Sequence, residues 1–237
     1  MAKYPVSRGW ESEDWREWLG SHRREAERRL QELEQGKGDP VEHVHEVRKI
    51  LKRMRAGMRL LCKVVGSDSC ETVRAACRDA GRLLAGSRDQ AVRLQTFEGV
   101  VGEDDGEEEE NVAVVRRRLE REARKADTGA GGQAESALQL LKLTKIPADR
   151  WTDELGATRL HKALRRLLKR ARTEYLDIHN GHSETFHELR KRVKDIYYSL
   201  SALPVEVEGE VGPATKKLKR LSDTLGVEND IAVLLEW

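Results

Sequence analysis

A short basic motif occurs twice in this chain of 237 residues, and the repetition constrains the fold more than any other sequence feature. Residues 45–52 read HEVRKILK, and residues 187–194 read HELRKRVK, with five of eight positions identical. Residues 86–92 (GSRDQAV) resemble residues 227–233 (VENDIAV) at nearly the same offset. Two matched motifs in the same order predict two related halves.

The sequence around these motifs has the pattern of helices. Apolar residues recur at three- and four-residue spacing, and the only strand-like alternation, at 205–208 (VEVE), is short. Charged residues make up 36% of the chain and aromatic residues 5%, which suits amphipathic helices better than a β-sandwich. We expect an all-α fold of two related helical halves. Its segments are an N-terminal half (1–100), an acidic linker with connecting helices (101–150) and a C-terminal half (151–237).

Several boundaries follow from local signals. Asp39-Pro40 should begin the helix that carries the first motif, since proline is favoured in the first helical turn. The acidic run at 102–110 should be a solvated linker, because like charges repel and nothing apolar can be buried. Near the C-terminus we expect a loop over 205–213, then two helices over about 214–225 and 228–236.

The cysteines and the N-terminus bear on the cellular location. The three cysteines lack the spacing of a metal site, which favours reduced thiols and a cytoplasmic protein. The first residues contain no apolar leader, and no run of ~18 apolar residues occurs. We therefore expect no signal peptide, no membrane-spanning segment and no membrane partner.

Each copy of the basic motif forms one face of a predicted helix. With about 100° per residue, the cations of the first copy fall within an arc of roughly 120°, opposite an apolar stripe that includes Val47 and Met54. The second copy has the same two faces, and Tyr198 joins its basic face. The basic faces comprise His45, Arg48, Lys49, Lys52, Arg55 and Arg59 in the first copy, and His187, Arg190, Lys191 and Lys194 in the second.

These faces contain almost no acidic residue, which is unusual for a solvated helix. Like charges at i,i+3 and i,i+4 spacing, such as Arg48 and Lys52, repel one another unless an anion lies between them. Arg holds phosphate through a bidentate fork, and Lys acts as a compact point charge. The pattern therefore favours a polyanion ligand, and the alternative is that acids on neighbouring helices neutralise both faces.

The two basic motifs and the later matched pair resemble the CHAD family, the conserved histidine α-helical domain. The residues that carry the resemblance are His45-x-x-Arg48-Lys49-x-x-Lys52-x-x-Arg55 and His187-x-x-Arg190-Lys191-x-x-Lys194, followed by 87–92 and 225–233. The resemblance covers nearly the whole chain. It implies two helical bundles related by a pseudo-twofold axis. It also implies a basic channel between them that binds inorganic polyphosphate, with one motif on each wall. The sequence departs from the pattern at Tyr197, which occupies the position of Arg55 in the first copy.

Further residues are candidates for the same surface. Arg165, Arg166 and Lys169 precede the second motif, and Arg78 and Lys219 occupy matching repeat positions. Asp89 and Asp230 also match; we expect them to cap helices or pair with the basic faces, and metal ligation is the alternative.

The function expected from these patterns is non-catalytic binding of polyphosphate. The sequence contains no phosphate loop, no nucleophile elbow and no zinc-type cysteine pairing, so we expect no enzyme activity, no metal and no cofactor. Nucleic acid is the alternative partner, although bases stack on aromatic rings and the basic faces contain few. Association with polyphosphate granules in the cytoplasm would be consistent with this function.

Overall fold

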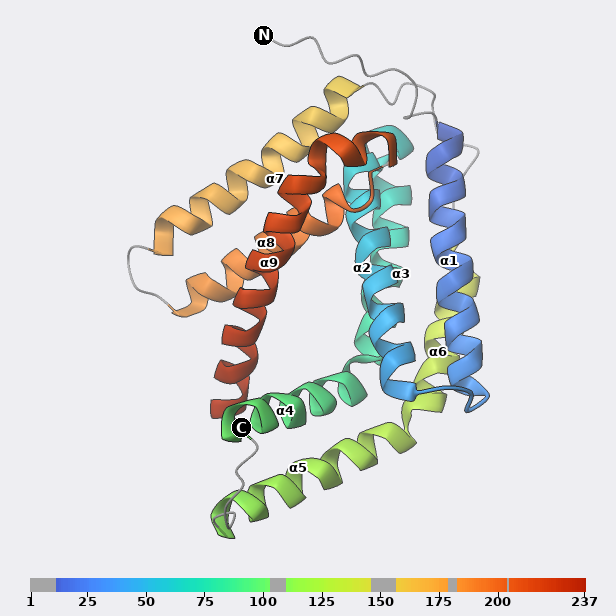
Figure 1. The fold of residues 1–237 in the computed structure, drawn as a ribbon. Coiled ribbons are helices and arrows are strands. Elements are labelled where there is room, and N and C mark those ends of the chain that lie inside the picture. Colours follow the sequence, from blue (N-terminus) through green and yellow to red (C-terminus); the bar gives the residue numbers. More distant parts are fainter. Residues whose placement is uncertain (1–11, 103–109, 146–156, 179–182, 204) are drawn as a thin grey trace.

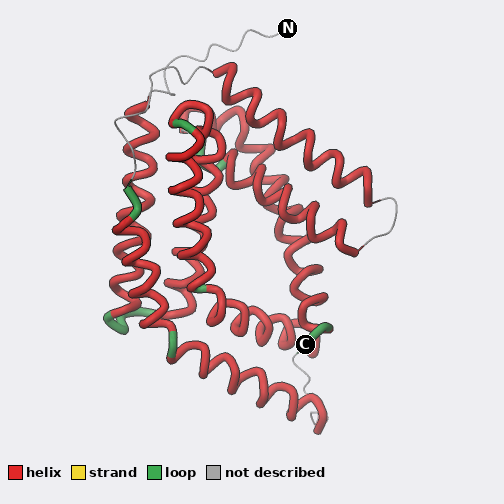
Figure 2. Tube along the Cα trace, turned by 180° about the vertical axis from the view of Figure 1, so that it is seen from behind, coloured by secondary structure: helices red, strands yellow, loops and turns green. Residues whose placement is uncertain are grey.

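The computed structural model describes residues 12–102, 110–145, 157–178, 183–203 and 205–237 (Figure 1). Within these ranges the chain is helical, with short connections and no strand (Figure 2), which confirms the predicted all-α class. Residues 103–109 of the predicted acidic linker lie outside the described residues. The helices are α1 (Ser12–Glu34), α2 (Pro40–Val65), α3 (Ser67–Leu83), α4 (Ala85–Val101), α5 (Glu110–Thr128), α6 (Ala130–Leu143), α7 (Ala157–Asp177), α8 (Ser183–Leu200) and α9 (Val205–Leu235).

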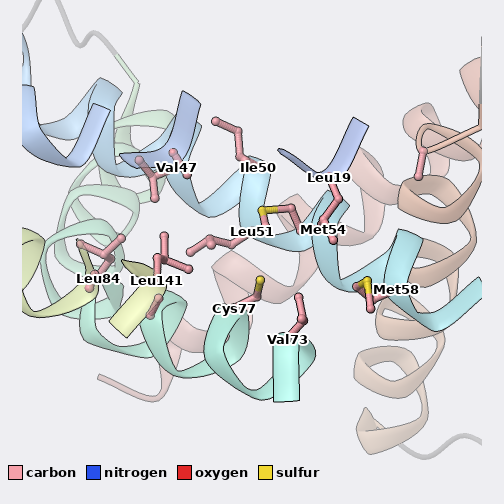
Figure 3. Packing of buried hydrophobic residues seen from close by; sticks show 14 of the residues in the cluster. Leu19, Val47, Ile50, Leu51, Met54, Met58, Val73, Cys77, Leu84 and Leu141 are labelled. Carbon is pink, nitrogen blue, oxygen red and sulfur yellow. The ribbon is translucent and has the colours of Figure 1, made fainter. Parts of the chain in front are cut away.

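Helices α1, α2, α3 and α6 pack into a bundle (Figure 1). Their apolar faces meet in one core, seen at close range in Figure 3. On α2 the buried residues include Val47, Met54 and Met58, on the side that the helical periodicity predicted. Burying each such side chain contributes about 1.5–3 kcal/mol, so this stripe determines which way α2 faces. Its basic face consequently points out of the bundle.

Local signals determine where α2 begins and how closely it approaches α1. The Asp39 carboxylate accepts a hydrogen bond from the Val41 backbone N–H at 2.9 Å, and Pro40 occupies the first turn, as predicted. Gly57 lies against α1, where an added Cβ would come within 2.7 Å of the Trp18 ring. Its lack of a side chain allows the two helices to pack this closely.

Helices α7, α8 and α9 form a second group, in which α8 contacts both of the others. α8 also packs against α2, so the two helices that carry the basic motifs are in contact. A small apolar cluster of Leu189, Val193 and Leu225 joins α8 to α9. The hairpin of α4 and α5 extends from the bundle, and α4 reaches α9 (Figure 1).

The C-terminal region differs from its prediction. Instead of a loop over 205–213 and two helices, α9 runs without a break from Val205 to Leu235 and contains Pro213. In the first half, α3 and α4 meet at Leu84, whereas the equivalent Leu225 lies inside α9. Packing along both α8 and α4 stabilises the long helix despite the hydrogen bond that Pro213 cannot donate.

The prediction of three reduced cysteines is also wrong. Cys62 near the end of α2 and Cys70 in α3 form a disulfide across the turn at Gly66, with Cα atoms 5.1 Å apart. Cys77 is a free, buried thiol. Sequence spacing could not reveal this pairing, because it depends on how sharply the chain turns at Gly66, which has φ +86°. In the described ranges, no helix is both long and apolar enough to cross a bilayer.

Candidate functional site

Four helices surround one polar cavity of about 750 Å³ between the bundle and the α8–α9 pair. Helices α2 and α4 come from the first half of the chain, and α8 and α9 come from the second. The lining residues are His45, Arg48, Lys49 and Lys52 from α2; Asp89, Val92 and Arg93 from α4; Arg190, Lys194, Tyr197 and Tyr198 from α8; and Lys219, Ser222, Asp223, Gly226, Val227, Asn229, Asp230 and Val233 from α9.

The first wall is the basic face of α2. Arg48 donates a hydrogen bond to the Gly81 carbonyl at 3.0 Å, which anchors the guanidinium to α3, and its other terminal nitrogen lies 3.8 Å from the Asp89 carboxylate. Lys49 donates to Glu46 at 2.7 Å, one turn earlier on the same helix. These contacts hold the cations at the cavity edge while leaving them partly exposed.

The second wall repeats this arrangement on α8. Arg190 lies 3.7 Å from the Asp230 carboxylate, which corresponds to the pair between Arg48 and Asp89. The prediction that the matched acids pair with the basic faces is therefore confirmed. Because N⁺–H···O⁻ hydrogen bonds are ~2.7–2.9 Å long, both contacts are ion pairs without a tight bidentate bond. Arg190 could thus turn towards an anion in the cavity, and Arg48 could offer the nitrogen that faces Asp89 while its other nitrogen stays bonded to Gly81.

The cavity has an excess of positive charge. Of the described lining residues, seven are Lys or Arg and three are Asp, with His45 in addition. Each of the three carboxylates has a cation nearby, since Lys219 donates to Asp223 at 2.8 Å. An anion that enters the cavity would therefore meet a positive electrostatic potential, because the three carboxylates offset the charge of the seven cations only in part.

Two adjacent phenols complete the α8 wall. The rings of Tyr197 and Tyr198 have centroids 5.0 Å apart and are tilted by 56°. Burial raises the pKa of Tyr198 to about 12, so its hydroxyl is neutral at physiological pH and can donate a hydrogen bond. Tyr197 lines the cavity although Arg55, its counterpart in the first copy, does not. The α8 wall therefore presents a phenol at a lining position where an arginine would have placed a cation.

Several predicted residues of the first half lie outside the cavity lining. Arg59 forms an ion pair with Asp195 of α8 at 2.5 Å, where the two motif helices cross. Burial lowers the pKa of Arg55, which lies beside Arg59. Arg78 contacts Asp79 at 3.1 Å and Glu71 at 3.7 Å on its own helix. Arg55 and Arg59 share a helical face with lining residues, and Arg78 shares the repeat position of Lys219. The crossing of α8 over α2 and the acids near Arg78 separate these three residues from the cavity.

Of the predicted residues in the second half, Arg190, Lys194 and Lys219 line the cavity. The others do not. His187 is exposed, with Nδ1 2.7 Å from the Asn229 amide oxygen, so it contacts a lining residue without being one. Lys191 is about half exposed and donates to Glu188 at 2.6 Å. Arg165, Arg166 and Lys169 are exposed on α7, none of whose residues lines the cavity.

Arg93 is a lining residue that the motif comparison missed. Its guanidinium donates to Gln90 at 2.9 Å and lies 3.7 Å from Glu122 of α5, with the Trp237 ring 5.6 Å away. The sequence did contain a signal, because Arg93 follows Asp89 by four residues and so shares its helical face. The comparison overlooked it because the second copy has no cation at that position.

Comparison with known proteins agrees with this architecture. A crystal structure of the CHAD domain from the plant Ricinus communis matches 98% of this chain and 80% of its own, with a TM-score of 0.72 and 16% sequence identity. At that identity the likeness concerns the fold alone. Among curated proteins, none matches the chain significantly. The family model of the CHAD domain matches residues 16–237, nearly the whole sequence, and this chain therefore belongs to the CHAD domain family.

Proposed function

We propose that this protein binds inorganic polyphosphate, without catalysis, in the cavity between α2, α4, α8 and α9. The observation that carries the proposal is the convergence of the two repeated basic motifs on one cavity. Arg48, Lys49 and Lys52 face it from one side, and Arg190 and Lys194 face it from the other. The CHAD resemblance of these motifs points to the same ligand.

The proposed binding mode follows from the chemistry of the lining. A phosphate chain presents charge at every unit, and cations on two opposed helices can contact it from both sides. The guanidiniums of Arg48 and Arg190 would exchange their long contacts with Asp89 and Asp230 for shorter, bidentate contacts with phosphate oxygens. The neutral hydroxyl of Tyr198 would add a hydrogen bond. A location in the cytoplasm and its polyphosphate granules is part of the proposal, but it no longer rests on reduced thiols, because Cys62 and Cys70 are disulfide-bonded.

Single-stranded nucleic acid is the second candidate, and one observation favours it. Tyr197 and Tyr198 both line the cavity, and tyrosine rings stack on bases in many single-strand binding proteins. The two rings pack on each other, however, and the cations outnumber the aromatic residues in the lining. Polyphosphate satisfies the cations without requiring a partner for the rings.

The test is a competition titration of long-chain polyphosphate against single-stranded RNA and ATP at fixed salt. Replacing one lysine on each wall, with Lys49→Gln and Lys194→Gln, should weaken polyphosphate binding by tenfold or more and flatten its salt dependence, since fewer counterions are released. A matched control removes two exposed cations from α5, with Arg117→Gln and Arg124→Gln.

The control should retain the affinity of the unaltered protein, because α5 contributes nothing to the lining. Polyphosphate recovered after incubation should keep its chain length, as expected of binding without turnover. Preferential binding of RNA, or equal losses in the two double variants, would overturn the proposal.

A further inference from the structure

The outer face of α7 is strongly basic and lies apart from the cavity. Between Leu160 and Thr173 this helix contains no acidic residue. Its exposed cations are Lys162, Arg165, Arg166, Lys169, Arg170 and Arg172. Within the described part of the chain, none of these six makes an ion pair, and the acid of α7 that does so is Glu174, with Arg192 of α8. The neutralisation found around the cavity is absent from this face.

Large apolar side chains interleave with these cations. Leu168, Tyr175 and Leu176 are 55%, 58% and 52% exposed. At about 100° per residue, Leu168, Arg172, Arg165 and Leu176 follow one another around roughly 80° of the helix, and Tyr175 adjoins them. The opposite side of α7 buries Leu160 and Leu167 and packs against α8. Helix α7 is therefore already folded and anchored with this mixed face outward, at the edge of the molecule (Figure 1).

We infer that this face of α7 is a peripheral docking surface for anionic phospholipid bilayers. A soluble polyanion would use the cations and gain nothing from the exposed leucines. A bilayer interface accommodates both groups, because leucine and tyrosine enter the boundary of the acyl chains while Lys and Arg extend to the lipid phosphates. The absence of acids also matters, since the surface of anionic lipid would repel them.

Peripheral docking requires no spanning segment, so it is compatible with the lack of one in the described helices. It departs from the expectation of no membrane partner, which rested on hydrophobic length alone. The inference is independent of polyphosphate binding, because α7 does not line the cavity. A polyphosphate chain and a bilayer could therefore be held at the same time on different surfaces.

Flotation with lipid vesicles tests this surface. The complete chain should float with vesicles of phosphatidylcholine that contain about a quarter phosphatidylserine, and not with phosphatidylcholine alone. Arg165→Gln with Arg172→Gln should lower partitioning roughly thirtyfold, from the usual contribution of each cation near an anionic leaflet. Leu168→Ser with Leu176→Ser should lower it about tenfold while leaving the charge unchanged.

Three controls separate this surface from others. The α5 variant Arg117→Gln with Arg124→Gln removes the same charge elsewhere and should float like the unaltered protein. The cavity variant Lys49→Gln with Lys194→Gln should also float. Circular dichroism should show that the exposed α7 substitutions leave the helices folded.

Failure to float with anionic vesicles would overturn the inference, as would a loss caused equally by the α5 or cavity variants. Undiminished flotation of the leucine variant would also overturn it. In that case the face would respond to negative charge alone, and a soluble polyanion would be its occupant.

Discussion

At the scale of single residues, tertiary neighbours decide what a cation does. Arg48 and Arg59 share one face of α2, yet Arg48 lines the cavity and Arg59 pairs with Asp195 where α2 and α8 cross. The side chains of Arg59 and Asp195 are 22% and 29% exposed, so water screens their attraction only in part. We regard this pair as a connection between the two motif helices.

Breaking this pair should therefore reduce stability without weakening ligand binding. Arg59→Gln or Asp195→Asn should lower the free energy of unfolding by roughly 1–2 kcal/mol, between the values typical of exposed and buried pairs. Urea titration of both single variants and the double variant measures the coupling. A loss of polyphosphate affinity as large as that of the cavity variant would show that Arg59 contacts ligand after all.

The buried thiol of Cys77 leads to a prediction about pH. Burial raises the pKa of this thiol to about 12 from an ordinary value of about 9. The folded protein therefore holds the proton more tightly than the unfolded chain does. The stability that Cys77 contributes is complete below about pH 9 and is lost as the pH rises towards 12.

The difference in unfolding free energy between the unaltered protein and Cys77→Ala should accordingly shrink over that range. The comparison cancels other groups that titrate there, including Tyr198. At pH 8 a thiol reagent should modify Cys77 only after unfolding, because the thiol is buried. Cys62 and Cys70 are disulfide-bonded and should not react. Rapid labelling of the native protein, or a difference that does not vary with pH, would contradict the burial.

At the scale of elements, the two halves differ at one joint. The first half separates α3 from α4 at Leu84, so α4 turns away from the bundle. In the second half the equivalent segment remains helical through Leu225, and α9 supplies both the contacts to α8 and the residues that face α4. This difference places Asp223, Gly226 and Asp230 along one helix at the cavity.

Gly226 lies where the sequence predicted a break between two helices and where the structure has the continuous helix α9. An added Cβ at Gly226 meets nothing within 4 Å, and the residue does not have a positive φ. Gly226→Ala should therefore raise the free energy of unfolding by up to about 1 kcal/mol, the usual gain of alanine over glycine inside a helix. Gly66 is the control, because its φ of +86° makes Gly66→Ala destabilising. Urea titration without ligand gives both values, and destabilisation by Gly226→Ala would indicate a break in α9.

At the scale of the whole molecule, the cavity joins parts of the chain that are far apart in sequence. Helices α2 and α4 belong to the first 101 residues, and α8 and α9 begin after residue 182. The direct link between the halves includes contacts of α2 with α7 and α8, and of α4 with α9. A ligand held by all four helices would add to these contacts.

Polyphosphate should therefore raise the Tm of the whole chain. A ligand that binds only the folded state stabilises it by about 2.7 kcal/mol at a hundredfold excess over Kd. Differential scanning calorimetry with long-chain polyphosphate should show this shift for the unaltered protein and for the α5 control Arg117→Gln with Arg124→Gln. The cavity variant Lys49→Gln with Lys194→Gln should lose most of it. An equal shift in both variants would mean that the stabilisation arises from nonspecific charge.

The sequence by itself determined the properties that depend on neighbours along the chain. Periodicity was sufficient to identify the all-α class and the two basic faces, and the Asp39-Pro40 signal was sufficient to identify the start of α2. Repetition was sufficient to match Asp89 with Asp230, which pair with equivalent arginines.

Only the tertiary structure decided which part of each face meets the cavity. The crossing of α2 and α8 assigns Arg59 to Asp195, and the approach of α4 to α9 brings in Arg93. Long-range packing also keeps α9 continuous and leaves the basic face of α7 outward. The physical reason is that helical periodicity defines the faces of one helix, whereas the residues that cover a face come from segments far away in sequence.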